Sequence, residues 1–167
     1  PVIIYILEFG HKGTDDFQSN LARLHQLPKA DIHFIQTEEQ FHALPKEQVV
    51  IDALFGSGLN RNLEGVTAKL VEHINNSRCE IISIDIPSGL FVDHSSNGNA
   101  AIKATHTLSF QCYKTAFLVA ESQEYIGELH ILDIGLHNSF FQSVFTRFEL
   151  VDEVIIHSIY KPRNRFA

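Results

Sequence analysis

The stretch ISIDIPSGLFVD, residues 82–93, decides the fold, because it carries an apolar strand directly into a polar turn. The run IISI that leads into it is typical of a strand buried on both faces of a parallel sheet. Asp85 follows where this strand leaves the sheet, and Pro87 and Gly89 favour a tight turn. The position of the carboxylate raises the question of whether it serves a site or only the turn.

Strand-like and helix-like segments alternate on either side of this stretch, which is typical of βαβ units. The expected strands are 2–7, 31–36, the start of 48–58 and 80–85, followed by strand-like pieces at 106–112, 127–135 and 148–159 with little helix between them. The expected helices are 16–27 with Thr14 or Asp15 as cap, a short one after Thr37, and 64–76, with a helical turn or bend at 98–104. The sequence therefore predicts an α/β fold with a central, mostly parallel sheet, helices on both faces and further strands at one edge.

Length and composition are typical of one globular domain. The 167 residues are 44% hydrophobic and 20% charged, which allows a sizeable core. A net charge of -7 argues against a nucleic-acid surface, which would be basic. No apolar run reaches the roughly 18 residues of a membrane span, and no signal peptide is visible. We therefore expect a cytoplasmic protein that binds neither nucleic acid nor membranes.

Cysteine and histidine form no metal-binding pattern along the chain. Cys79 and Cys112 lie in or next to strand-like regions, and we expect reduced, packed thiols rather than a disulfide. The ten histidines include no HExxH motif and no Cys/His cluster. We interpret them as scattered surface and core residues.

Two carboxylates end similar strands about one βαβ repeat apart. Asp52 ends VVID and Asp85 ends IISID. If both strands are parallel, both side chains emerge at the carboxyl edge of the sheet, where open α/β sheets bind ligands. Each aspartate could instead only cap the turn behind it. For Asp52 and Asp85 together, a ligand site and simple turn capping are about equally favoured.

The segment LFGSGLNRN, residues 54–62, follows the first of these strands. Gly56 and Gly58 let the backbone approach a ligand, and successive N–H groups could hold an anion. The segment matches neither GxGxxG nor a Walker loop. Arg61 would suit a phosphate, although a surface arginine is the ordinary interpretation.

Ser88 and its neighbouring carbonyl groups offer hard oxygen atoms beside Asp85. Together with Asp52 they could hold a hard cation. A nucleophilic role for Ser88 is weaker, because no GxSxG surrounds it and no histidine is placed by the sequence to activate it. Lys114 lies just past a strand and could reach the same edge, but we expect a solvated side chain there.

Four segments carry a resemblance to a known family: DALFGSGL, SIDIPSGLFVD, HTLSFQCYK and GELHILDIGL. In this order they closely resemble the YjeF N-terminal domain of NAD(P)HX epimerases, over roughly residues 48–136 and more loosely over the whole chain. The resemblance implies a Rossmann-like three-layer α/β/α sandwich with a mostly parallel central sheet. It also implies interconversion of the R and S epimers of hydrated NADH or NADPH at carbon six of the nicotinamide ring. A dehydratase then restores the S form to NAD(P)H.

The resemblance implies roles for individual residues. Asp52 and Ser88 match positions that bind one potassium ion per subunit. Asp85 matches the acidic residue that contacts the substrate and is the best candidate for proton transfer. The loop that binds the dinucleotide substrate matches Gly56, Ser57, Gly58, Leu59, Asn60, Arg61 and Asn62. Homodimers or larger homo-oligomers are also implied.

One family motif, a GNNGGDG-like loop after the first strand, is not evident here. The segment GHKGTDD, residues 10–16, keeps only two glycines and one aspartate in rough register. We prefer the alignment in which VIIYIL is the second strand and the loop lies ahead of residue 1. Residues 1–160 then form an N-terminally incomplete domain, and residues 161–167 a linker toward a kinase-like dehydratase domain of a bifunctional protein.

A second hypothesis is a non-catalytic module of the same fold that binds a nucleotide ligand or serves dimerisation. The presence of both Asp52 and Asp85 favours catalysis. Absence of the asparagine loop would favour the non-catalytic module.

Overall fold

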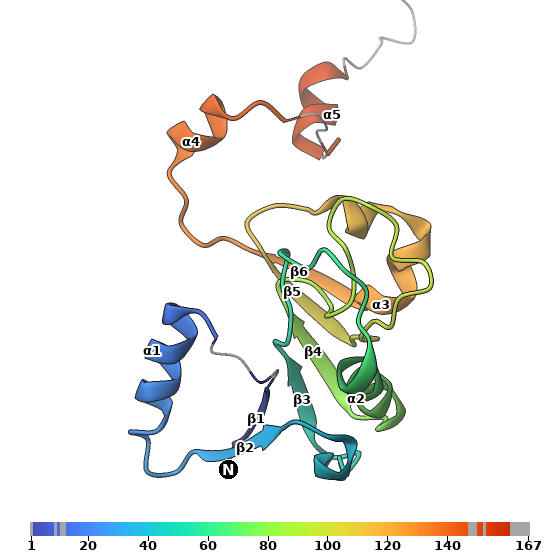
Figure 1. The fold of residues 1–167 in the computed structure, drawn as a ribbon. Coiled ribbons are helices and arrows are strands. Elements are labelled where there is room, and N and C mark those ends of the chain that lie inside the picture. Colours follow the sequence, from blue (N-terminus) through green and yellow to red (C-terminus); the bar gives the residue numbers. More distant parts are fainter. Residues whose placement is uncertain (1, 9, 11–12, 147–149, 152, 161–167) are drawn as a thin grey trace, which may run out of the picture. The chain divides into compact units, whose positions relative to one another are not determined.

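The computed structural model describes residues 2–8, 10, 13–146, 150–151 and 153–160 (Figure 1). The chain divides into two compact units, Pro1–Ile134 and Gly135–Ala167, and each is described by itself. The first unit contains all the strands found in the described residues. Every helix in this part of the chain is too short or too polar to cross a bilayer.

Parallel strands and helices alternate through most of the first unit. Its strands are β1 (Ile3–Leu7), β2 (Asp31–Ile35), β3 (Val49–Asp52), β4 (Glu80–Ile84), β5 (His106–Phe110) and β6 (Glu128–Leu132). Its helices are α1 (Asp15–Leu24), α2 (Gly65–Asn76) and α3 (Gln123–Ile126), with short 3₁₀ helices η1 (Glu38–Gln40), η2 (Thr115–Leu118) and η3 (Ala120–Ser122). Strands β1 and β2 form one parallel pair, and β3, β4, β5 and β6 form a parallel sheet in that order. The predicted α/β class with a mostly parallel sheet is confirmed.

Local sequence explains where the two longer helices begin and which face they bury. The Thr14 side chain accepts a hydrogen bond from the Phe17 backbone N–H at 3.2 Å, so Thr14 is the cap that the sequence predicted for α1. Helix α2 lies within the predicted range 64–76 and buries Leu70, Val71 and Ile74 at helical spacing. By contrast, none of the residues of α1 is fully buried.

The core lies on one face of the four-stranded sheet. Helix α2 packs there in a cluster with Ile81, and a second cluster around Ile86 and Phe117 continues the core. Burial alternates along β4, where Ile81 is 3% exposed while Ile82 is only partly buried. The expectation that this strand is covered on both faces is therefore wrong for the described residues. Ile51, on the same face as Ile82, is exposed.

The expected strand at 148–159 is also wrong. Residues Glu153–Ile159 form helix α5 of the second unit, which also contains α4 (Asn138–Ser143). A short apolar run rich in isoleucine fits either a strand or a helix, so hydrophobicity alone does not decide between them. Residues 147–149 and 152 lie outside the described part. In the first unit, η2, η3 and α3 occupy the region between β5 and β6 where little helix was expected.

A cavity of about 840 Å³ is lined by both β1 and β3. Its other walls come from α2 and from the segment around Phe41 and Leu44. Among the described strands, β1 pairs only with β2, and β3 pairs only with β4. Each of these two strands therefore has an edge without a strand partner, and both line the same cavity.

Candidate functional site

The two carboxylates predicted from the sequence lie at neighbouring strand ends. Asp52 is the last residue of β3 and is paired with Ser83 of β4. Asp85 directly follows the last residue of β4. Because β3 and β4 are parallel, both aspartates lie at the carboxyl edge of the sheet, the edge at which open α/β folds bind ligands.

Asp52 is the centre of a buried hydrogen-bond network, and only 2% of it is exposed. Its Oδ1 accepts from the Ser88 hydroxyl at 2.6 Å and from the Leu54 N–H at 3.3 Å. Its Oδ2 accepts from the Ser83 hydroxyl at 2.7 Å and from the Ser88 N–H at 2.9 Å. These bonds compensate the desolvation of a buried carboxylate and fix the turn that carries Ser88.

Asp85 is held between the glycine loop and a lysine. Its Oδ2 accepts from the Ser57 N–H at 2.9 Å, and its Oδ1 forms an ion pair with the Lys114 ammonium group at 2.8 Å. The side chains of Asp85 and Lys114 are 17% and 12% exposed, so the pair is mostly shielded from water. A carboxylate in this position is fixed in orientation yet still reaches the surface.

Residues 54–62, the glycine loop, are attached to both networks. The Phe55 N–H donates to the Ser88 hydroxyl at 2.9 Å, and the Ser57 N–H reaches Asp85 two residues later. A Cβ at Gly56 would lie 3.0 Å from the Asp85 carboxylate, so a larger residue there would press on this group. The rest of the loop reaches the surface: Ser57, Gly58, Asn60, Arg61 and Asn62 are exposed, and Leu59 is partly buried.

The turn after β4 is fixed from behind by residues 99–102. Gly89 has φ +104°, and a Cβ there would lie 2.1 Å from the carbonyl oxygen of Ala100. The Asn99 amide donates to the Gly89 carbonyl at 2.7 Å, and the Ile102 N–H donates to the Ser88 carbonyl at 2.9 Å. Glycine is therefore required at position 89 for both backbone conformation and space.

Lys114 is the site residue that sequence reasoning missed, since a solvated side chain was expected there. Its ammonium group contacts the Ser109 hydroxyl as well as Asp85, and Ser109 is fully buried on β5. The available signal was position alone. Lys114 follows the carboxyl end of β5, and β5 is the neighbour of β4 in the sheet.

The atoms around Ser88 match a hard cation in chemical type. The Asp52 carboxylate and the Phe55 carbonyl oxygen both lie within hydrogen-bond distance of the Ser88 hydroxyl, at 2.6 Å and 3.2 Å. Hard cations such as calcium take about six to eight oxygen ligands, so these three residues would supply only part of a coordination shell. Both oxygens of Asp52 already accept two hydrogen bonds each, and a bound ion would replace at least one of those donors.

Both cysteines are free: Cys79 is buried, and Cys112 is exposed. The expectation of unpaired thiols is confirmed, whereas the expectation of a packed thiol is wrong for Cys112. It follows β5, where the chain leaves the sheet toward the surface.

Comparison with known proteins gives consistent matches. Residues 1–116 match the family model described as YjeF-related protein N-terminus. The chain is 36% identical over 116 residues to the bifunctional NAD(P)H-hydrate repair enzyme Nnr of Vibrio cholerae. The aligned region covers 70% of this chain and 24% of that protein. It is 34% identical over 120 residues to the NAD(P)H-hydrate epimerase of Lentilactobacillus buchneri, and the aligned region covers 72% of this chain and 52% of that protein.

A third relative is the NAD(P)H-hydrate epimerase of Oenococcus oeni, at 29% identity over 137 residues, with 82% of this chain and 62% of that protein covered. The chain thus matches about a quarter of the bifunctional relative and somewhat more than half of the two epimerases. The family model covers well over half of the chain and includes β1 to β5 and both aspartates. The chain therefore belongs to the YjeF-related protein N-terminus family.

Proposed function

We propose that this chain belongs to an NAD(P)H-hydrate epimerase, an isomerase that interconverts the R and S forms of hydrated NADH and NADPH. The names of the relatives support this activity. The observation that carries the proposal is the position of Asp85 at the sheet edge. Its carboxylate lies between the Ser57 N–H and the Lys114 ammonium group, beside an exposed glycine loop.

In the proposed reaction, Asp85 is the catalytic residue that moves the proton. It enters the cycle protonated and gives this proton to the hydroxyl group on carbon six, and the C–O bond breaks so that its electrons leave with water. The ring nitrogen stabilises the resulting cation with its lone pair. Water then adds to the other face, and the proton that it releases returns to Asp85 through solvent, so atoms and charge balance. Lys114 and the Ser57 N–H stabilise the carboxylate between the two steps.

The glycine loop is the proposed binding segment for the dinucleotide. Its exposed backbone between Gly56 and Asn62 allows close approach of a diphosphate, and Arg61 offers a planar, bidentate donor for a phosphate group. Two backbone hydrogen bonds, from Phe55 and Ser57, fix the start of the loop against the turn and the catalytic carboxylate. Binding and proton transfer would thus share one rigid support.

We also propose that Asp52 and Ser88 hold one potassium ion per subunit, with the Phe55 carbonyl as a third ligand. When bound, the ion would supply fixed positive charge that positions the loop and the turn. At equal ionic strength, KCl should raise the melting temperature more than NaCl does, because only a fitting ion binds the folded state. Ser88→Ala should abolish this difference, and Ser95→Ala, an exposed serine, should not. Equal melting temperatures in both salts for the unaltered chain would remove potassium from the proposal.

The cavity lined by β1 and β3 supports the proposal that the domain is N-terminally incomplete in this chain. Two strands, each with one edge that no other described strand pairs with, line one mostly apolar space. A further parallel strand from residues ahead of residue 1 would satisfy both edges and fill the cavity. It would also bring the expected asparagine-rich loop to the carboxyl edge, where the partial cation shell lies.

The bifunctional relatives support a longer protein in which a dehydratase domain follows this one. A cytoplasmic location and a homodimer or larger homo-oligomer remain part of the proposal. The expected linker, 161–167, lies outside the described residues.

The deciding experiment measures epimerisation of R-NAD(P)HX by coupling it to a dehydratase specific for the S form. It is done with this chain and with the gene product that contains it. Asp85→Asn should slow the reaction by about 100-fold or more, because proton transfer is lost. Asp93→Asn, at an exposed aspartate beyond the turn, is the matched control and should keep the rate.

Equal rates for the two variants would remove Asp85 from the mechanism. If the unaltered gene product binds NADPH without epimerising the hydrate, the non-catalytic module is the correct function instead.

A further inference from the structure

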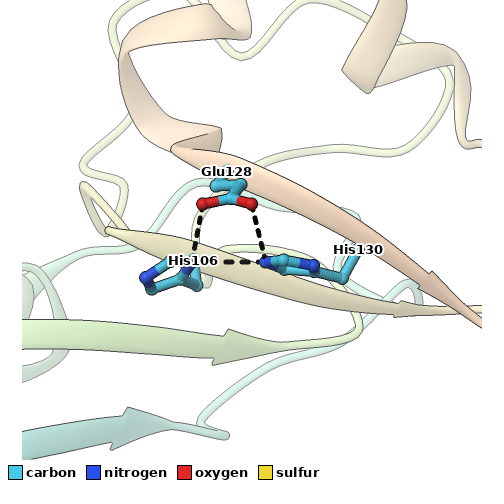
Figure 2. A group of neighbouring side chains, drawn as sticks. All are labelled: His106, Glu128 and His130. Atoms are coloured by element: carbon cyan, nitrogen blue, oxygen red, sulfur yellow. Dashed lines mark hydrogen bonds and ion pairs between the residues drawn. The ribbon is translucent and has the colours of Figure 1, made fainter.

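Three metal-ligating side chains meet at the amino ends of β5 and β6, a cluster that we call the histidine cluster: His106, Glu128 and His130 (Figure 2). His106 and Glu128 begin their strands and are paired in register. His130 is paired with Leu108, so its side chain lies on the same face of the sheet as the other two. All strands of this sheet are parallel, so the cluster lies at the edge opposite the Asp85 site.

The distances within the cluster suit one small metal ion. His106 Nδ1 lies 3.3 Å from His130 Nε2. The two oxygens of Glu128 lie 3.6 Å from His106 Nδ1 and 3.7 Å from His130 Nε2. With metal–ligand bonds of about 2.0–2.1 Å and tetrahedral angles, ligand atoms are separated by about 3.3 Å. The three side chains therefore already surround a point at which they could bind an ion after only small movements.

A fourth residue, Glu80, lies where it could accept a hydrogen bond from the second ring nitrogen of a metal-bound His106. The other ring nitrogen of His106, Nε2, lies 3.7 Å from a carboxylate oxygen of Glu80, the first residue of β4. Metal-binding histidines usually donate their second N–H to a carboxylate or carbonyl, which fixes the ring orientation. Nδ1 of His106 thus points to the proposed ion, while Nε2 points to its support.

We propose that His106, Glu128 and His130 bind a divalent transition-metal ion, for which zinc is the best match. Two imidazoles and one carboxylate are ordinary zinc ligands, and they leave a fourth position for water. The side chains of His106 and His130 are 30% and 39% exposed, so an ion has access from solvent. A bound ion would connect β5 to β6 at the start of both strands.

The experiment uses zinc alone as the probe, measured by calorimetry, and cobalt as a spectroscopic substitute. The unaltered chain should bind one zinc ion, and cobalt should give the intense visible absorption of a tetrahedral site. His106→Gln and His130→Gln should each weaken zinc affinity by about 100-fold, and Glu128→Gln by about tenfold or more. His25→Gln, at the exposed end of α1, is the matched control and should bind zinc like the unaltered chain.

Circular dichroism identifies any variant that fails to fold. If His106→Gln fails to fold, His130→Gln and Glu128→Gln decide the outcome, because both residues are more exposed. The proposal is overturned if His25→Gln weakens binding as much as the cluster variants do. It is also overturned if zinc binding leaves the melting temperature unchanged while cobalt shows only weak octahedral absorption.

Discussion

Asp85 adopts an uncommon backbone conformation, with φ at 72° although it is not glycine. Its N–H donates to the Leu108 carbonyl at 2.8 Å, and its carboxylate is fixed by Ser57 and Lys114. Such a residue persists only when its surroundings hold it in place, and backbone outliers concentrate at functional sites. The backbone conformation of Asp85 therefore adds support to its proposed role, beside the fixed position of its side chain.

The Asp85–Lys114 pair should be energetically coupled. A double-mutant cycle with Asp85→Asn and Lys114→Met should give a coupling of about 1–2 kcal/mol in the free energy of unfolding, because both side chains are mostly shielded. The exposed pair of Glu38 and Lys69 is the control, and Glu38→Gln with Lys69→Met should give less than about 0.5 kcal/mol. Urea unfolding of each set measures both values. Similar coupling in the two cycles would show that Asp85 and Lys114 are no more than a surface pair.

Gly89 should be intolerant of any side chain. Gly89→Ala should destabilise the chain by about 3 kcal/mol or more, since the added Cβ meets the Ala100 carbonyl and φ is +104°. Gly58→Ala is the control, because a Cβ there meets nothing within 4 Å. It should change the free energy of unfolding by less than about 1 kcal/mol. Equal melting temperatures for the two variants would contradict the described turn.

At the scale of elements, α3 is attached to the segment before β5 by an exposed ion pair. Lys103 and Glu124 lie 2.6 Å apart. The hydrogen bond from Lys103, and then its charge, lower the pKa of Glu124 below its ordinary 4.5. Because the pKa is lower in the folded state, this stabilisation is present above pH 4.5 and is lost as the pH falls through the folded-state value.

Glu124→Gln should therefore flatten the acid limb of stability. From about pH 6 to about pH 3, the free energy of unfolding should fall less steeply for this variant than for the unaltered chain. Glu121→Gln, at a carboxylate in the preceding 3₁₀ helix, should keep the original slope. Urea titrations at several pH values measure the slope of the free energy of unfolding against pH. Identical slopes for the unaltered chain and both variants would contradict the role of the Lys103–Glu124 pair.

Elements were predictable where one signal dominated. Strand β4 and helix α2 each have a run of one clear period, and the structure places both within a residue or two of the expectation. Helix α5 was missed because its isoleucine-rich run fits a strand equally well. The alternating burial of β4 was also missed, because exposure of Ile82 depends on what covers the sheet and not on the strand itself.

At the scale of the whole molecule, the space between β1 and β3 should behave as an open strand position. In this chain, about half of the amides of β1 and β3 should exchange with solvent quickly, since each strand has one edge without a partner among the described strands. In a longer gene product with the further strand, the same amides should exchange about 10-fold to 100-fold more slowly. The amides that pair β5 with β6 are the internal control and should not change. Unchanged exchange at β1 and β3 in the longer product would exclude a strand between them.

The sequence by itself determined the α/β class, the positions of most strands and the two aspartates at strand ends. These features depend on local patterns, such as apolar runs that stop at a polar turn. Only the tertiary structure decided that Lys114 pairs with Asp85 and that His106 meets Glu128 and His130. Those contacts follow from strand order and register, which bring together side chains in or next to different strands although they lie far apart along the chain.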